Sequence, residues 1–369
     1  MVSFQPSEEQ QLIRDTVAAF AGEQVRPLAH EADESGTVPS SIIEQGWELG
    51  LVQSAIPEAY GGAGDTRSAI TGALVAEELA WGDLSIALHL LAPRLVIYPL
   101  LDAGTAEQQA RVLNAYTGAH FAAGSAAVME PRFDFDLAEL TATATRQNGG
   151  YVLNGAKCYV PLGSDAEHLV VYARTDGGTG YEGVNGFLIE KGTPGLTVVE
   201  REKNMGIKAL ATYELSLENC RVPAANRLGG DAGCNFAKLM NYSRVGLAAM
   251  AVGVARAAFE YARDYAKDRK AFGVAIGQKQ AIAFMLAEMA LEIDATRLLA
   301  WEAAWKLDRG EDATREAYLA KNYAANMVLK VTDNAVQVLG GHGYIREHPV
   351  EMWLRNGRGF ATFEGLVMI

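Results

Sequence analysis

The chain has 369 residues, of which 49% are apolar and 21% are charged, so it can bury a large core and form two or three structural units. Its formal net charge of −13 repels phosphate backbones and anionic lipid, which argues against nucleic acid or a membrane as a partner. The three cysteines form no C-x-x-C pair and have no histidine at ligand spacing, so no metal site is predicted. The first residues show no basic or apolar leader and no window has the length of a membrane span, which predicts a cytoplasmic protein.

The first third of the sequence has the pattern of helices. Ser7 and Gln10 form a capping box, and apolar residues then recur at helical spacing, which predicts a helix over residues 7–26. The same periodicity between turn-rich stretches predicts further helices over residues 39–50, 68–92 and 105–116. We therefore expect a helical N-terminal domain over residues 1–120.

The middle of the sequence has the pattern of an antiparallel β structure. Asn148-Gly149 lies between two alternating segments and is a strong hairpin signal, since both turn positions need a positive φ. Further short strands, separated by glycine-rich turns, are predicted over residues 169–174, 186–190, 196–199 and 213–217. An antiparallel barrel or sandwich over residues 121–232 fits this pattern.

Helical periodicity returns after Gly233, with an apolar stripe from Phe236 to Tyr261. More helices are predicted over residues 277–308, 313–339 and 347–356. The later helices carry apolar residues nearly all round, which we attribute to burial on several sides or against another subunit. The prediction is a C-terminal four-helix bundle over residues 233–369, so the chain is expected to be mostly α with a β middle domain.

Four segments of the last third stand out by their order and spacing: Arg269-Lys-Ala-Phe272-Gly273, Gln280, Gln337-Val-Leu-Gly340-Gly341-His-Gly-Tyr344 and Phe363-Glu364-Gly365. Together with the PEAYGG turn at residues 57–62, this set resembles the acyl-CoA dehydrogenase family over the whole chain. The resemblance implies FAD between the β domain and the bundle, α,β-desaturation of an acyl-CoA thioester, and an electron-transferring flavoprotein as electron acceptor. It also implies a homotetramer, a dimer of dimers in which a neighbouring subunit clamps each FAD.

The resemblance identifies Glu364 as the base that removes the α-proton of the acyl group. A carboxylate that faces an apolar acyl pocket has its charged form disfavoured, which makes it a stronger base. By itself, a lone glutamate near the end of the sequence is more often a solvated surface residue. Phe363 and Gly365 beside it favour the catalytic interpretation, and Gly365 is expected to contact the substrate.

The resemblance also points to a substrate contact from the first helix of the bundle. It places Arg244 near the mouth of the acyl pocket, and Asn241 stands there in place of a common aspartate. Some members carry the base one residue before this arginine, but Ser243 cannot act as a carboxylate, which favours Glu364. The other interpretation of Arg244 is a surface salt bridge.

The resemblance assigns a separate set of residues to FAD. Arg269 would pair with the pyrophosphate, because a guanidinium offers phosphate oxygens a charge-assisted fork. The remaining residues of this set are Phe272, Gln280, Gln337, Gly340, Gly341, Met129 and Tyr159. The two glycines would let the backbone approach the diphosphate, although such a pair is by itself more typical of an interhelix turn.

The sequence departs from the family pattern around the flavin. A run of small residues is replaced by Arg-Phe-Asp-Phe-Asp at 132–136, and Pro161 stands where the strand after the aromatic Tyr159 usually carries a hydroxyl. After the glutamate, Leu366 and Met368 stand where the family has a threonine and a glutamine that contact FAD. In the family, the lost contacts serve a chain's own FAD, whereas the retained ones reach the FAD of the dimer partner.

Three functions stay open at this point. The first is a homotetrameric FAD-dependent dehydrogenase with Glu364 as its base. The second is a non-catalytic or half-site subunit of a heterotetramer, which completes the FAD site of a homologous subunit. The third is a flavin monooxygenase on the same fold, which the retained glutamate disfavours.

Overall fold

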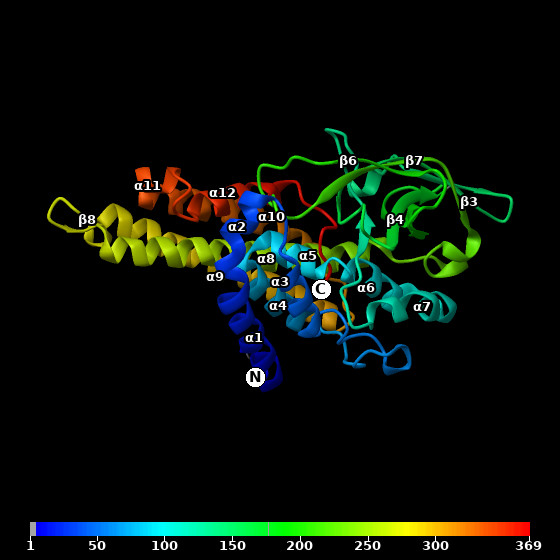
Figure 1. Cartoon of the computed structure of the whole chain (residues 1–369), viewed down its shortest axis with the longest axis horizontal. Helices are drawn as coiled ribbons and strands as arrows, with labels where there is room; N and C mark the ends of the chain where they lie inside the picture. Colours follow the sequence, from blue (N-terminus) through cyan, green and yellow to red (C-terminus); the bar gives the residue numbers. More distant parts are fainter. Residues whose placement is uncertain (1–4, 176) are drawn as a thin grey trace.

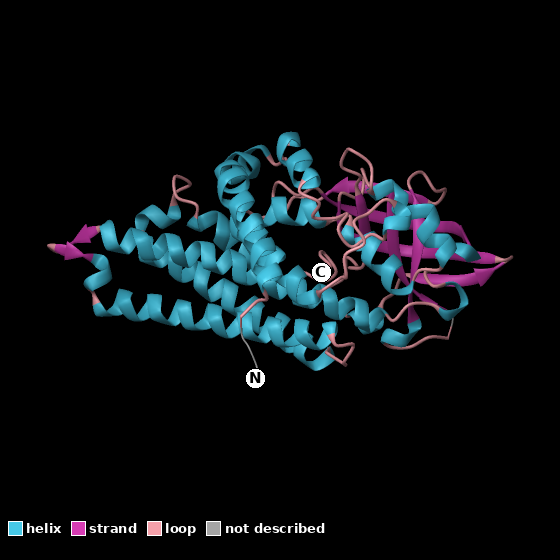
Figure 2. Cartoon of the chain, turned by 90° about the horizontal axis from the view of Figure 1, so that it is seen from below, coloured by secondary structure: helices cyan, strands magenta, loops and turns pink. Residues whose placement is uncertain are grey.

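The computed structural model describes residues 5–175 and 177–369. Helices from both ends of the chain form one elongated body, and a β-sheet lies at one end of it (Figures 1 and 2). A two-stranded hairpin joins two long helices at the opposite end (Figure 1). The order of a helical part, a β part and a second helical part agrees with the sequence prediction.

The N-terminal helices are α1 (Glu8–Phe20), α2 (Ala29–Ser35), α3 (Ser40–Glu48), α4 (Ala69–Gly82), α5 (Leu84–Leu91), α6 (Arg94–Ala103) and α7 (Ala106–Val112). The predicted single helix over residues 68–92 is wrong, because Asp83 has an extended backbone with φ −160° and separates α4 from α5. The carboxylate of Asp83 accepts the N–H of Ile86 at 2.9 Å and so caps α5. Burial raises the pKa of Asp83 to about 6.

The strands are β1 (Gly124–Ala127), β2 (Thr143–Gln147), β3 (Gly150–Pro161), β4 (His168–Thr175), β5 (Val184–Glu190), β6 (Leu196–Arg201) and β7 (Thr212–Pro223). They form one sheet in the order β1-β4-β2-β3-β7-β6, with β5 paired to β4. The hairpin between β2 and β3 is confirmed, since Asn148 has φ 48° and Gly149 has φ 78°.

The sequence predicted a purely antiparallel sheet, and this prediction is wrong. β4 lies between β1 and β2 and runs parallel to both of them. The other pairs, β2 with β3, β3 with β7, β4 with β5 and β6 with β7, are antiparallel. Local alternation of apolar residues predicts strands but carries no information on which distant strand becomes a neighbour. For this reason the two parallel pairs could not be predicted.

The later elements are α8 (Phe236–Asp268), β8 (Lys270–Ala271), β9 (Val274–Ala275), α9 (Gln280–Asp308), α10 (Thr314–Leu339), α11 (Gly341–Tyr344) and α12 (Val350–Arg358). At 33 residues α8 is about 50 Å long, and it packs along α10, α4 and α9. Its length and hydropathy match those of a membrane span, contrary to the sequence prediction, but 78% of its apolar window is buried inside the protein. Its position in the core accounts for that composition.

The N-terminal helix α4 joins the C-terminal helices closely. A Cβ added to Gly253 of α8 would come within 2.2 Å of the carbonyl oxygen of Glu77 on α4. The Glu77 carboxylate also accepts hydrogen bonds from Arg256 of α8 at 2.8 Å and from Arg297 of α9 at 3.0 Å. Helices from both ends of the chain therefore pack into one helical body.

Candidate functional site

Glu364 lies just after the helical turn Gly359–Ala361, and its side chain is 14% exposed. Its Oε1 lies 3.0 Å from Nζ of Lys321 on α10, and its Oε2 lies 3.7 Å from Nε of Arg244 on α8. The two cations at these distances hold the carboxylate in one orientation. The apolar surroundings expected from the sequence are thus replaced, at the carboxylate itself, by two positive charges.

Lys321 is the residue of this site that sequence reasoning missed. It is only 8% exposed and shares a buried face of α10 with Ala317, Ala320 and Ala324. A lysine in such a face needs an anionic partner, so its position among buried alanines was the available signal. Which carboxylate it meets is decided by how α10 packs and cannot be read from the spacing.

Arg244 is buried and does not form a surface salt bridge. Its Nη2 donates a hydrogen bond to the hydroxyl of Tyr181 at 2.9 Å, and its guanidinium lies 5.5 Å from the ring centroid of Tyr318. The aromatic contacts and Glu364 together hold the guanidinium in one place.

Several buried polar atoms at this site have no hydrogen-bond partner among the described residues. They are Oδ1 of Asn241, Oγ of Ser243, Nε of Arg244 and Oε2 of Glu364. An unsatisfied buried polar group costs about 1–3 kcal/mol, and Nε of Arg244 and Oε2 of Glu364, which lie 3.7 Å apart, are a pair that a ligand could complete. Asn241 is only partly available, because its Nδ2 donates to Oγ1 of Thr314 at 3.0 Å and ties α8 to α10.

A pocket of about 300 Å³ lies between the sheet and the last helices. Its lining residues are Tyr159, Asn204, Met205, Gly206, Ile207, Arg355, Arg358, Gly359, Thr362 and Phe363. The rings of Tyr159 and Phe363 meet edge to face with centroids 6.3 Å apart. The pocket therefore contains an aromatic pair, and Phe363 directly precedes Glu364 in the chain. It lies at the junction where the family resemblance places the flavin.

The backbone at Tyr159 is unusual. Tyr159 has φ 51°, which is rare for a bulky residue, and a bulge interrupts the pairing of β3 with β7 at this point. Its N–H donates to both carboxylate oxygens of Glu202, at 3.0 and 3.2 Å. The backbone N–H of Tyr159 is therefore already bonded to Glu202 and is not free for a ligand. Pro161, two residues later, has no backbone N–H to donate.

A buried ion pair supports the same wall. Nζ of Lys157 donates to Oε1 of Glu130 and to the carbonyl oxygen of Val128, each at 3.0 Å. Burial lowers the pKa of Lys157 to about 8, and the lysine together with backbone donors holds the pKa of Glu130 below its usual value. Met129 is buried beside this pair, and its carbonyl oxygen accepts the N–H of Cys158 at 3.0 Å.

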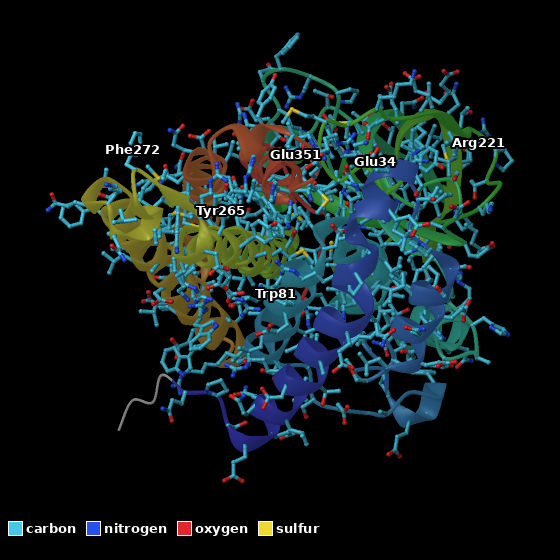
Figure 3. All side chains as sticks on the ribbon, turned by 60° about the vertical axis from the view of Figure 1, so that its left-hand side comes forward. Glu34, Trp81, Arg221, Tyr265, Phe272 and Glu351 are labelled. Atoms are coloured by element: carbon cyan, nitrogen blue, oxygen red, sulfur yellow. The ribbon has the colours of Figure 1, made fainter. Side chains whose placement is uncertain are left out.

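The remaining residues assigned to FAD lie at the other end of the molecule. Arg269 ends α8, Phe272 lies in the β8–β9 turn, and Gln280 begins α9; all three are exposed, Phe272 to 93%. Phe272 lies at the opposite edge of the molecule from Arg221 of the sheet (Figure 3). Because α8 is about 50 Å long, these side chains cannot reach Tyr159 of their own chain.

Gln337, Gly340 and Gly341 lie beside this hairpin. The hydroxyl of Tyr265, near the end of α8, is 2.8 Å from Nδ1 of His342 and links α8 to α11. Gln337 and both glycines are exposed, and a Cβ added to either glycine would meet nothing within 4 Å. A ligand or another protein chain can therefore approach this backbone closely.

Family models match the chain along nearly its whole length. The acyl-CoA dehydrogenase N-terminal domain matches residues 7–119, the middle domain residues 125–220 and the C-terminal domain residues 233–366. A cyclohex-1-ene-1-carbonyl-CoA dehydrogenase of Geobacter metallireducens is 38% identical over 363 residues, which are 97% of this chain and 95% of that protein. The chain belongs to the acyl-CoA dehydrogenase family. It is thus an oxidoreductase that acts on CH–CH bonds.

Other members of the family show the same extent of similarity. The short-chain specific acyl-CoA dehydrogenase of rat mitochondria is 34% identical, over 97% of this chain and 87% of that protein. The butyryl-CoA dehydrogenase structure from Megasphaera elsdenii has a TM-score of 0.89 and 33% identity, covering 98% of this chain and 96% of that one. An FAD complex of PigA has a TM-score of 0.89 and 28% identity, covering 98% and 95%. FAD is the cofactor of the family.

The residues of this acyl-CoA dehydrogenase family member fit FAD as two separate halves. Tyr159 and Met129 form an aromatic and apolar wall beside the proposed base, whereas Arg269 supplies a cation suited to phosphate at the far end. The structure therefore brings Glu364, Arg244, Gly365 and Tyr159 together and leaves the Arg269 group apart from them. Within one chain the two halves do not meet.

Proposed function

We propose that this chain catalyses the FAD-dependent α,β-dehydrogenation of an acyl-CoA thioester, with Glu364 as the α-proton base. The observation that carries the proposal is the pairing of Glu364 with Lys321 and Arg244, which orients this partly buried carboxylate next to the pocket of Tyr159 and Phe363. When bound, FAD supplies the acceptor for the hydride that leaves the β-carbon.

The two carboxylate oxygens of Glu364 have different roles in this proposal. Lys321 holds Oε1, so the side chain is oriented without using both oxygens. Oε2 has no hydrogen-bond partner among the described residues and is the atom that accepts the proton. Arg244, fixed by Tyr181, positions the ligand beside that oxygen.

The proposed assembly is a homotetramer in which each FAD lies between two chains. Tyr159 and Met129 come from one chain, and its partner contributes the group of Arg269, Phe272, Gln280, Gln337, Gly340 and Gly341. Large apolar side chains on α9 that are exposed in the single chain support an assembly, and they recur every seventh residue at Phe284, Leu291, Leu298 and Trp305. Such a stripe is typical of a helix that packs on another subunit.

A half-site subunit of a heterotetramer is the second candidate. Glu202 takes the N–H of Tyr159, and Pro161 offers neither a hydroxyl nor an N–H, so the chain's own flavin wall lacks donors. The far group, by contrast, keeps its arginine and glutamines in exposed positions. A chain of this kind would complete the cofactor site of a homologous partner and leave its own site weak.

The electron acceptor proposed for the dehydrogenase is an electron-transferring flavoprotein. A similar structure, with a TM-score of 0.88 and 34% identity, comes from work on the electron transferring flavoprotein of Acidaminococcus fermentans. A cytoplasmic location belongs to the same proposal.

The test is to purify the chain alone and measure bound flavin per chain, then to add acyl-CoA thioesters of increasing length and follow bleaching of the flavin absorbance. Near one flavin per chain with bleaching supports the homomeric dehydrogenase. Little flavin alone, restored on mixing with a homologous subunit, supports the half-site subunit instead. Full flavin occupancy without bleaching by any thioester would count against both.

A further inference from the structure

The segment that follows Glu364 runs into the core. Gly365 has φ +70°, and a Cβ there would come within 2.5 Å of Val128, so only glycine makes this turn without a clash. Leu366, Val367, Met368 and Ile369, here called the plug segment, are each 2% exposed or less. In Figure 1 this red stretch ends among the N-terminal helices, and Figure 2 shows the same end between the helical body and the sheet.

The plug segment fills a cleft between α4 and α8. A Cβ added to Gly72 of α4 would lie 2.7 Å from Cβ of Ile369, and one added to Gly246 of α8 would lie 3.0 Å from Cγ1 of Val367. Each helix thus has a glycine where the segment passes, and a larger side chain would close the cleft. The walls suit an extended apolar chain.

Arg67 binds the far end of the plug segment. Its Nε donates to the main-chain oxygen of Ile369 at 3.0 Å, and its Nη2 donates to the same atom. Its guanidinium lies 3.8 Å from the ring centroid of Tyr242 and 4.1 Å from that of Tyr98. Among the described residues no side-chain carboxylate pairs with Arg67, so the plug segment satisfies a cation held between two aromatic rings.

The cleft and the proposed base share α8. Arg244 of α8 meets the Glu364 carboxylate, and Gly246, two residues further on, meets the plug segment. The pocket of Tyr159 and Phe363 lies on a different side, toward the sheet. An acyl chain whose α-carbon lies at Glu364 and that follows α8 would therefore enter the space that the plug segment fills.

We propose that the plug segment occupies the acyl cleft of its own chain, latched by Arg67, and that an acyl thioester must displace it to bind. This inference rests on the proposed function, because the cleft receives an acyl chain only if Glu364 faces one. No bond is made or broken in the exchange: one apolar chain replaces another, and Arg67 gives up the main-chain oxygen of Ile369.

The first test compares the full chain with a variant ending at Gly365. The probes are S-butyl-CoA, a thioether that cannot be oxidised, and CoA itself, which lacks the acyl chain. We expect the shortened chain to bind S-butyl-CoA at least tenfold more tightly than the full chain does, with an unchanged affinity for CoA. Equal affinities of the two chains for S-butyl-CoA, or no binding by either, would overturn the proposal.

Variants of the full chain test the same proposal in case the shortened chain fails to fold. Arg67→Met and Ile369→Ala weaken the latch and the plug and should each tighten S-butyl-CoA binding several-fold. Ile42→Ala in α3 is the matched control, since Ile42 is equally buried and lies outside the plug segment and its contacts. A gain in the control equal to that of Ile369→Ala would show a general loosening and would refute the latch.

Amide hydrogen exchange supplies a readout that is independent of catalysis. Residues 366–369 should be protected in the free protein and lose that protection when S-butyl-CoA binds, whereas CoA should leave them protected. Retained protection at saturating S-butyl-CoA would refute displacement even if the chain oxidises acyl thioesters. Flavin bleaching without displacement of residues 366–369 would therefore refute this inference alone and would still support the proposed function.

Discussion

The two ends of this molecule treat their functional residues in opposite ways. Around Glu364 the charged groups meet partners from their own chain: Lys321 and Arg244 pair with Glu364, and further in Arg67 binds the plug segment. Around the β8–β9 hairpin, Arg269 and Phe272 are exposed. Under the proposals made above, the first end opens for a ligand and the second is covered by another chain.

This difference separates two kinds of evidence for a site. At the Glu364 end the signal is burial, with polar atoms that remain unsatisfied inside the protein. At the hairpin end the signal is an apolar ring and a cation left in solvent. Mutations at the buried end should change stability as well as function, and mutations at the exposed end should change function alone.

The largest effect is expected from Glu364→Gln. Loss of the base should lower the rate of flavin bleaching by an acyl-CoA at least about 1,000-fold, or about 4 kcal/mol, while flavin stays bound. Stopped-flow absorbance measures the rate. The matched control is Glu316→Gln on α10, a similarly buried carboxylate that lies 2.8 Å from Lys306. A Glu364→Gln rate within tenfold of the wild-type rate would remove this residue from the chemistry.

Lys157→Met tests whether the wall beside the base depends on its buried ion pair. Removing the lysine leaves Glu130 buried without its closest cation, which should lower the free energy of unfolding by about 3 kcal/mol. Urea denaturation followed by circular dichroism measures the change. The control is Lys330→Met, whose pair with Glu292 is half exposed and should cost less than about 1 kcal/mol. Equal losses for the two variants would contradict the contrast drawn between buried and exposed groups.

Asp83→Asn should stabilise the buried end in a pH-dependent way. Because burial raises the folded-state pKa of Asp83 from 3.8 to about 6, the stability it contributes below pH 4 is lost as the pH rises through 6. Asparagine can cap α5 without a charge, so the variant should equal the wild type near pH 4 and exceed it by up to about 3 kcal/mol at pH 8. Thermal unfolding from pH 4 to 8 measures this, with the exposed Asp65→Asn as control. A constant difference across that range would refute the assignment.

The smallest effect on stability is expected at the hairpin. Phe272→Ala should change the free energy of unfolding by less than about 0.5 kcal/mol, because the ring is exposed, yet it should weaken flavin retention about tenfold. Leu12→Ala is the control, since Leu12 is an exposed apolar residue of α1, apart from both proposed halves of the flavin site. Flavin loss is measured by fluorescence of the filtrate after dilution. Identical retention in both variants would mean that the hairpin does not clamp a cofactor.

Much of the architecture was readable from local sequence. The capping box at Ser7, the Asn148-Gly149 turn and the long helices were predicted because contacts three or four residues apart, or one turn apart, decide them. The family resemblance supplied the candidate residues, from Glu364 to Arg269. It also supplied the expectation that they would serve one cofactor from two chains.

Only the tertiary structure decided what those residues meet. The parallel neighbours of β4, Lys321 beside Glu364 and Arg67 on Ile369 all join segments by non-local packing. A one-dimensional pattern records the chemistry of each residue and its spacing along one element, but it carries no information on which distant element comes within 3 Å. The sequence thus determined the family and the candidate functional groups, and packing determined which of them are paired, buried or exposed.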